Sequence, residues 1–242
     1  MIHRLKTKYQ KGFSIIELIV VVAIMLVVTS VTLLRQSKFS SDILITNMAY
    51  AIGLDIREAG VLGTSSRQSD YVTTVGSGNS DEDQYRVGYG VHFSMNADGN
   101  DTNTYVKFVD LPDPSTVAAG VNADFNYYYD NGSDPVNGGL VTMSQGRILR
   151  FCGQGDAGWD CVSDASNDPN TLDIVFVKPN PDAHITMGGS GGRNGRTYSS
   201  AIVVVQSALG DKCRTIRVYA SGQVAIDTID PEATNGGCDV VQ

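Results

Sequence analysis

The sequence predicts an α+β fold in which one long N-terminal helix precedes an antiparallel β domain. Residues 13–34 form an apolar run, and apolar residues then recur at helical spacing as far as Ala59. After residue 63, short runs of alternating apolar residues lie between turns rich in glycine, asparagine and aspartate. Four cysteines, all in the C-terminal half of the chain, predict disulfide-closed loops in this domain.

The composition allows one membrane helix and one sizeable globular domain. The chain has 242 residues, of which 42% are hydrophobic, and its net charge is −8. Residues 1–12 contain four Lys or Arg residues and no acid, so removing them would take the net charge from −8 to −12. Such an acidic surface argues against binding to nucleic acid or to anionic lipid headgroups.

Residues 1–12 are predicted to be a leader and residues 13–34 a transmembrane helix. The 22 residues of this helix extend about 33 Å, against a hydrocarbon core of about 30 Å. Lysine and arginine in the leader predict that it stays in the cytoplasm, with the following domain outside.

Glu17 is the unusual residue in this helix. A charge near the centre of a bilayer helix costs about 2.5–3.5 kcal/mol, so the carboxylate needs a partner. A secretory signal cleaved after the apolar run would need a small-residue site, and only residues 28–30 approach one. An uncleaved anchor needs no such site, but it does not explain a glutamate four residues after Phe13.

The residues around Glu17 resemble the class III signal peptides of type IV pilins and of type II secretion pseudopilins. The resemblance rests on a basic leader, an apolar helix and the motif Lys11-Gly12-Phe13-Ser14-Ile15-Ile16-Glu17. It implies that a prepilin peptidase cleaves between Gly12 and Phe13 and that the new amino group of Phe13 is N-methylated. It further implies that Glu17 pairs with this ammonium group on a neighbouring subunit, which offsets part of the cost of burying both charges.

The resemblance also implies a fold, a location and partners. In a pilin-like fold the long helix packs on the β-sheet, here with residues 35–62 as its amphipathic continuation and residues 63–242 as an extracytoplasmic β domain. The protein would be anchored in the cytoplasmic membrane before it enters a filament. Its partners would be other pilin or pseudopilin subunits, the prepilin peptidase and the inner-membrane assembly platform.

The helical continuation is predicted to end at Gly60 and to be weakest at residues 37–42. Many major pilins carry a proline in this helix, whereas this chain has none before Pro112, which favours a minor pilin or pseudopilin. Strands are predicted at residues 85–93, 104–109, 125–129, 147–152, 172–177, 201–206, 214–219 and 223–227. A hairpin turn is expected at residues 220–222 and a flexible loop at residues 188–192, and the strands from residue 172 onward resemble the C-terminal part of H-type minor pseudopilins.

The cysteines fall into two sequence-local pairs, neither with the C-x-x-C spacing of a metal or redox site. In an exported chain two disulfides are the expected state. Four cysteines allow three pairings, and we expect the sequence-local one, with partners as follows: Cys152 with Cys161, and Cys213 with Cys238.

No set of residues predicts an enzyme. Residues 153–158 match G-x-G-x-x-G, but no helical segment follows and cysteines flank them, so a disulfide-closed turn is expected. Residues 188–192 match G-x-S-x-G, but a nucleophile elbow needs a later histidine and His184 is the last in the chain. His92 and His184 are isolated in the sequence.

No cofactor is predicted, and calcium is kept only as a weak alternative. Residues 96–107 begin like an EF-hand loop, but Asp101 replaces its glycine and Lys107 its final glutamate. A looser site would use the following aspartates: Asp98, Asp101, Asp130 and Asp134. A C-terminal basic group lacks the interleaved aromatic residues of single-strand binders, so nucleic acid is not expected; its members are Arg193, Arg196, Lys212, Arg214 and Arg217.

The sequence therefore predicts a structural subunit of a type IV pilus or a type II secretion pseudopilus. The alternative is a membrane-anchored extracytoplasmic module that binds calcium, glycan or DNA and does not polymerise.

Overall fold

The computed structural model describes residues 12–65, 87–95, 103–111, 125–129, 134–156, 158–161, 169–189, 192–229 and 238. The chain divides into two compact units, Met1–Ser40 and Ser41–Gln242. One helix and eleven strands are assigned in the described residues, and all strand pairings are antiparallel. The predicted α+β class is confirmed.

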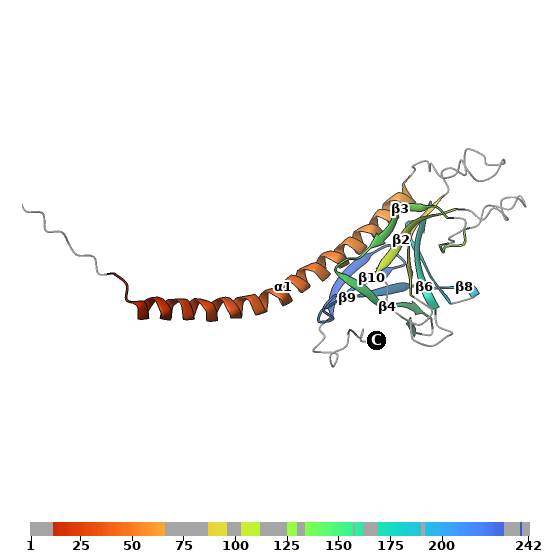
Figure 1. Cartoon of the computed structure of the whole chain (residues 1–242). Helices are drawn as coiled ribbons and strands as arrows, with labels where there is room; N and C mark the ends of the chain where they lie inside the picture. The colour runs from red at the N-terminus through yellow and green to blue at the C-terminus, as the bar shows by residue number, and fades with distance from the viewer. Residues whose placement is uncertain are drawn as a thin grey trace, which may run out of the picture. The chain divides into compact units, whose positions relative to one another are not determined.

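The helix α1 covers Ile15–Thr64 without a break, as the red to orange ribbon in Figure 1 shows. Residues 37–42, where the helix was predicted to be weakest, are α-helical. In the first unit, the side chains described in α1 are exposed. In the second unit the predicted apolar stripe is buried, with Ile45, Ile52 and Ile56 inaccessible to solvent.

The helix ends four residues beyond the predicted stop at Gly60. Gly60 and Gly63 lie inside α1 and face Phe176. A Cβ atom at Gly63 would come within 2.4 Å of the Phe176 carbonyl oxygen. Gly63 therefore allows the helix backbone to approach a strand closely, and neither glycine terminates the helix.

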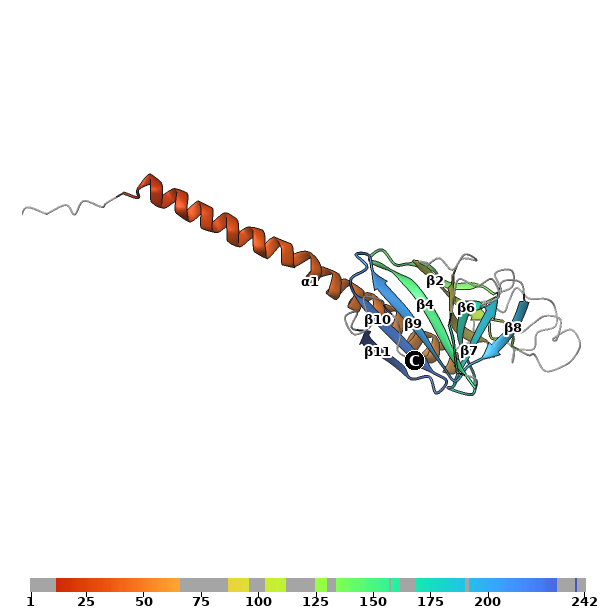
Figure 2. The same cartoon turned by 90° about the horizontal axis from the view of Figure 1, so that it is seen from below.

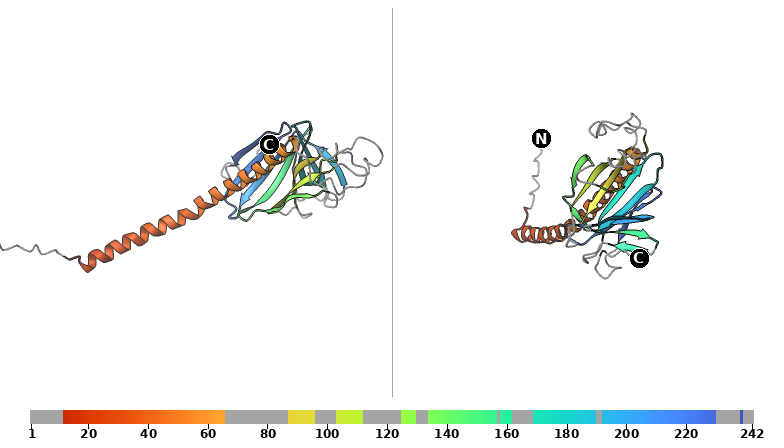
Figure 3. Two further views of the ribbon diagram at one scale, coloured as in Figure 1. Left: turned by 90° about the horizontal axis from the view of Figure 1, so that it is seen from above. Right: turned by 90° about the vertical axis from the view of Figure 1, so that its right-hand side faces the viewer.

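The strands form two sheets, which can be followed in Figures 2 and 3. The six-stranded sheet has the order β3 (Val136–Thr142), β2 (Thr104–Asp110), β1 (Gly88–Ser94), β6 (Pro169–Val177), β7 (Ala183–Gly189) and β8 (Gly192–Thr197). The five-stranded sheet has the order β11 (Val224–Ile229), β10 (Cys213–Tyr219), β9 (Ser200–Ser207), β4 (Gly146–Gly155) and β5 (Gly158–Cys161).

The main hydrophobic core lies between α1 and both sheets. Its members include Ile52 from α1, Phe93 from the six-stranded sheet and Val203 from the five-stranded sheet. Strand residues that point into this core alternate with residues on the opposite face, as the pleat requires.

Most predicted strands are present, and the hairpin predicted at residues 220–222 joins β10 to β11, with Gly222 at a φ of +80°. The prediction of a strand at residues 125–129 is wrong, because this segment pairs with no strand. The predicted loop at residues 188–192 also needs correction, because Gly188 and Gly189 end β7 and Gly192 begins β8. The strands β3, β7 and β8 were not predicted because they contain glycine, which is depleted in strands.

Both disulfides have the sequence-local pairing. Cys152 and Cys161 face each other across β4 and β5, and their bond closes the hairpin that contains the G-x-G-x-x-G match. The second bond joins Cys213 at the start of β10 to Cys238.

Candidate functional site

The chain is non-helical at Gly12, Phe13 and Ser14, immediately before α1. Phe13 is 84% exposed, and no atom lies within 4 Å of the position that a Cβ atom would take at Gly12. The peptide bond between Gly12 and Phe13 thus lies in exposed, irregular chain, which is the kind of segment that proteases cleave.

Glu17 lies in the first turn of α1. The carbonyl oxygen of Ser14 accepts hydrogen bonds from the amides of Glu17 at 3.1 Å and Leu18 at 3.2 Å, so the helix is established here. The positive end of the helix dipole favours a carboxylate in this turn. The first turn is a less costly position for a charge than the centre of the bilayer, because it is close to the end of the apolar segment.

The apolar part of α1 is long enough to cross a membrane. The segment Ile15–Leu33 has 19 residues and a mean hydropathy of 2.7, and none of it is buried within the chain. Its hydroxyl groups are satisfied by the helix itself: Thr29 donates to the Met25 carbonyl at 2.8 Å, and Ser30 donates to the Leu26 carbonyl at 2.7 Å. Such bonds reduce the cost of placing hydroxyl groups in hydrocarbon.

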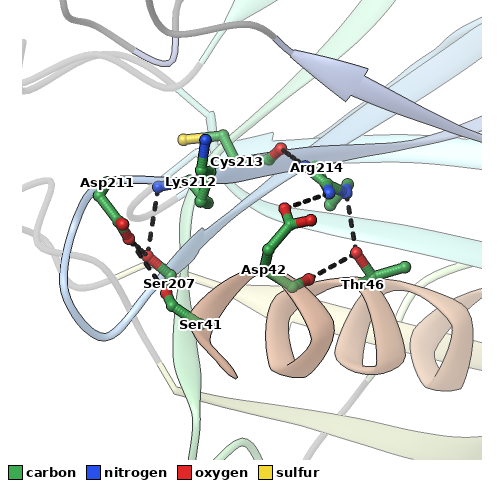
Figure 4. Close-up of polar contacts among 8 residues, drawn as sticks. All are labelled: Ser41, Asp42, Thr46, Ser207, Asp211, Lys212, Cys213 and Arg214. Atoms are coloured by element: carbon green, nitrogen blue, oxygen red, sulfur yellow. Dashed lines mark hydrogen bonds and ion pairs between the residues drawn. The ribbon is translucent and has the colours of Figure 1, made fainter. Parts of the chain in front are cut away.

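In the second unit, an ion pair fixes α1 to β10 (Figure 4). Arg214 of β10 donates from Nη2 to Asp42 Oδ1 at 2.6 Å and from Nε to Thr46 Oγ1 at 3.1 Å. Thr46 Oγ1 in turn donates to the Asp42 carbonyl at 2.7 Å, and Arg214 Nη1 donates to the Cys213 carbonyl at 2.8 Å. The guanidinium group thus joins the helix to the strand that carries a disulfide.

A second polar contact lies beside the first and centres on Asp211 (Figure 4). Its Oδ1 atom accepts hydrogen bonds from Ser41 Oγ at 3.0 Å and from Ser207 Oγ at 2.8 Å. Burial acts to raise the pKa of Asp211, but the hydrogen bonds from Ser207 and Ser41 and the neighbouring Lys212 charge outweigh it, so the pKa lies below its usual value. We call the two contacts together the helix clamp: Ser41, Asp42, Thr46, Ser207, Asp211 and Arg214.

The sequence did not single out the helix clamp. Ser41 and Asp211 are separated by 170 positions, and no local pattern predicts that they meet. The sequence placed Arg214 in a C-terminal basic group, whereas the structure buries it against Asp42. Arg217 lies 5.8 Å from the Trp159 ring centroid, so these two arginines do not form a free basic patch.

Further along α1, polar contacts join the helix to β2 and β11. Tyr105 donates from its hydroxyl group to Asp55, and Lys107 pairs with Asp55 at 3.3 Å and with Glu58 at 3.0 Å. Burial and the Asp55 carboxylate both raise the pKa of Tyr105, which keeps its hydroxyl group protonated as a donor. Arg57 donates to the Val224 carbonyl at 2.8 Å.

The described residues hold no group of three His, Cys, Asp or Glu side chains arranged for a metal ion. Of the four calcium candidates, Asp98, Asp101 and Asp130 lie outside the described residues, and Asp134 is buried, where its Oδ1 accepts the Leu111 amide at 3.1 Å. The two histidines that looked isolated in the sequence do have partners. His92 Nδ1 lies 2.7 Å from Asp173 Oδ1, and the His184 ring stacks on Tyr127 with 3.9 Å between centroids.

Comparison with known proteins identifies the N-terminal segment. Residues 7–33 match the family described as the prokaryotic N-terminal methylation motif. Comparisons with curated proteins and with solved structures give no match. The matched residues include Gly12, Phe13 and Glu17.

The motif supports a type IV pilin-like or pseudopilin precursor, and the apolar helix with antiparallel sheets and two disulfides is a pilin-like architecture. Proteins with this motif are structural, and the motif implies processing by a prepilin peptidase and assembly with other pilins. The apolar helix and the motif together fit a pilin anchored in the inner membrane.

Proposed function

We propose that this chain is a minor pilin or pseudopilin of a type IV pilus or a type II secretion pseudopilus. The observation that carries the proposal is the match to the methylation motif at residues 7–33, in which an exposed Gly12–Phe13 bond precedes α1. The absence of proline between residues 13 and 111 supports a minor subunit or pseudopilin over a major pilin.

In this proposal residues 1–12 are the leader, residues 13–34 the membrane segment, residues 35–62 the helical continuation and residues 63–242 the extracytoplasmic domain. Prepilin peptidase cleaves after Gly12, and the same processing methylates the new amino group of Phe13. Methylation keeps the positive charge, so the group remains a partner for a carboxylate.

Glu17 sets the register between subunits in the filament. The Glu17 side chain makes no hydrogen bond or ion pair with any residue that the structure describes, so its carboxylate is available to a second subunit. When the subunit leaves the membrane platform and enters a stack of helices, Glu17 meets the Phe13 ammonium group of a neighbour. Each charge then offsets part of the desolvation cost of the other.

Mass spectrometry of the mature N-terminus tests the processing step. A chain that begins at methylated Phe13 supports the proposal, whereas an intact Met1 would support the uncleaved anchor and overturn it. Gly12→Val should leave the full-length precursor, because the peptidase would have to accommodate a branched side chain beside the bond that it cleaves.

Glu17→Ala tests the assembly step separately. We expect normal cleavage and membrane insertion but filaments that are absent or at least tenfold fewer by immunoblot of sheared fractions. Glu17→Asp is the matched control, since it keeps the charge and should restore part of the assembly. Normal filament yield from Glu17→Ala would refute the role of this carboxylate.

A further inference from the structure

The segment of residues 125–129 covers the face of the six-stranded sheet that lies opposite α1. We call it the aromatic strap. On β1, β2 and β6, core residues that pack towards α1 alternate with the residues beneath the strap, among them His92, Phe108 and Asp173. The strap therefore lies outside the main core and has its own small apolar cluster, made of Phe108, Phe125, Val175 and Val177.

Three hydrogen bonds hold the strap to the sheet. The Tyr127 amide donates to Asp110 Oδ2 at 3.2 Å, and Thr186 Oγ1 donates to the Tyr127 carbonyl at 2.8 Å. The Tyr129 amide donates to Asp173 Oδ1 at 3.0 Å. Tyr127 has a φ of +56°, a conformation that a non-glycine residue adopts only when its surroundings impose it.

Ring contacts complete the attachment. Tyr127 stacks on His184 of β7 at an interplanar angle of 13°. The Tyr129 ring lies 5.0 Å from the His92 ring and 5.2 Å from the Phe108 ring, measured between centroids. Two of the three hydrogen-bond partners of the strap, Asp110 and Asp173, are carboxyl groups, and two histidine rings lie against its tyrosines.

Asp110 is the least well accommodated of these groups. Its side chain is fully buried, and its Oδ1 atom has no hydrogen-bond partner among the residues that the structure describes. Burial raises its pKa to about 8, assisted by the Asp134 and Asp173 carboxylates and opposed by the hydrogen bond from Tyr127. With the strap closed, Asp110 therefore keeps its proton at neutral pH, because a second or third negative charge in this space would be costly.

The ionisable groups around Asp110 come from every element beneath the strap. The described ones are Asp134 before β3, Asp173 of β6, His92 of β1, His184 of β7 and the strap residues Tyr127 and Tyr129. Burial lowers the pKa of His184, opposed by the Asp182 carboxylate, so its protonation would disturb the closed strap only in the acid range.

We propose that the aromatic strap is a pH-dependent latch, which is closed over the sheet while Asp110 holds a proton and opens as Asp110 loses it. The sign follows from linkage. A closed state that binds the proton more tightly than the open state is most stable in acid. Its stability relative to the open state falls as the pH rises towards the pKa that Asp110 has in the closed state. Between pH 6.5 and 8, the opening constant should therefore rise by up to about 15-fold, since each pH unit contributes at most a factor of ten and a closed-state pKa of about 8 halves the total.

Opening would expose the apolar cluster beneath the strap and the Asp173–His92 pair. These groups lie in the unit that the chain is proposed to place outside the membrane, where external pH acts on them directly. The latch itself requires only the contacts of the second unit, so it stands whether or not the chain assembles into a filament.

Hydrogen exchange of the full chain in detergent tests the latch. The peptide that covers residues 125–129 should lose protection by up to about 15-fold between pH 6.5 and 8, after correction for the intrinsic pH dependence of amide exchange. Asp110→Asn keeps the shape and the acceptor for Tyr127 but cannot ionise, so its protection should not change over this range. A wild-type protection factor that is constant across the range would overturn the proposal.

Two further variants keep the test decisive if Asp110→Asn fails to fold. Asp134→Asn removes a neighbouring negative charge and retains Asp110. The loss of protection between pH 6.5 and 8 should therefore be smaller than in the wild type. Asp227→Asn changes an exposed carboxylate on β11 and should behave as wild type. An Asp134→Asn protein whose protection falls as steeply as the wild type would also count against the latch.

Discussion

Replacing Asp42 by alanine should destabilise the second unit more than replacing its partner Arg214. The Arg214 side chain is only 9% exposed, whereas the Asp42 side chain is 46% exposed. Asp42→Ala therefore leaves a buried cation without its counter-charge. Arg214→Met instead leaves a half-exposed carboxylate that water can solvate, and it fills the buried space with an unbranched apolar chain.

The free-energy cost of Asp42→Ala should lie between two limits. Removing one partner of a fully buried pair costs about 3–5 kcal/mol, and removing one from an exposed pair costs about 0–1 kcal/mol. With one partner buried and the other half exposed, we expect Asp42→Ala to cost about 2 kcal/mol. The residual hydrogen bonds of Arg214 to Thr46 and to the Cys213 carbonyl, and the better helix propensity of alanine, keep the cost below the upper limit.

Urea unfolding in detergent measures this difference. The chain has a single tryptophan, Trp159, and it lies in β5, so its emission reports on the globular unit. Asn47→Ala, at an exposed position on the same helix, controls for helix propensity. The double variant with Asp42→Ala and Arg214→Met completes a mutant cycle. An Asp42→Ala cost below about 0.5 kcal/mol would refute this account of the clamp. An Arg214→Met cost larger than the Asp42→Ala cost would also refute it.

Two other substitutions test the packing of α1 and the closure of the β4–β5 hairpin. Gly63→Ala should cost about 1–3 kcal/mol because the new methyl group would overlap the Phe176 carbonyl, whereas Gly60→Ala has 3.5 Å of clearance and should be neutral or stabilising. Equal unfolding midpoints for the two variants would contradict this. Replacing both Cys152 and Cys161 by serine should cost about 2–4 kcal/mol, and an unchanged midpoint in urea would show that the bond does not constrain the unfolded chain.

Local patterns made part of the structure predictable. The apolar run, the helical spacing of Ile45, Ile52 and Ile56, and the β10–β11 turn with Gly222 depend on residues a few positions apart. Helices, turns and alternating strands are all governed by such short-range preferences. The disulfide pairing was also predicted correctly, because cysteines that are close in the sequence close short loops most easily.

Other features depend on residues far apart in the chain. Gly60 was predicted to end the helix because no local pattern indicates the contact with Phe176, whose ring faces Gly60 and whose backbone faces Gly63. The aromatic residues at 125–129 have the composition of a strand but lie on the face of the six-stranded sheet, where the Tyr127 and Tyr129 amides bond to the side chains of Asp110 and Asp173.

The sequence by itself determined the N-terminal motif, with Gly12, Phe13 and Glu17 at the start of an apolar helix, because that signal is linear. Only the tertiary structure decided that Arg214 is a buried partner of Asp42 and that Asp110 lies among other carboxylates beneath the strap. The environment of a charge is made by segments that meet only on folding. The same side chain can therefore be a solvated surface group or a buried one, and its sequence neighbours do not distinguish the two.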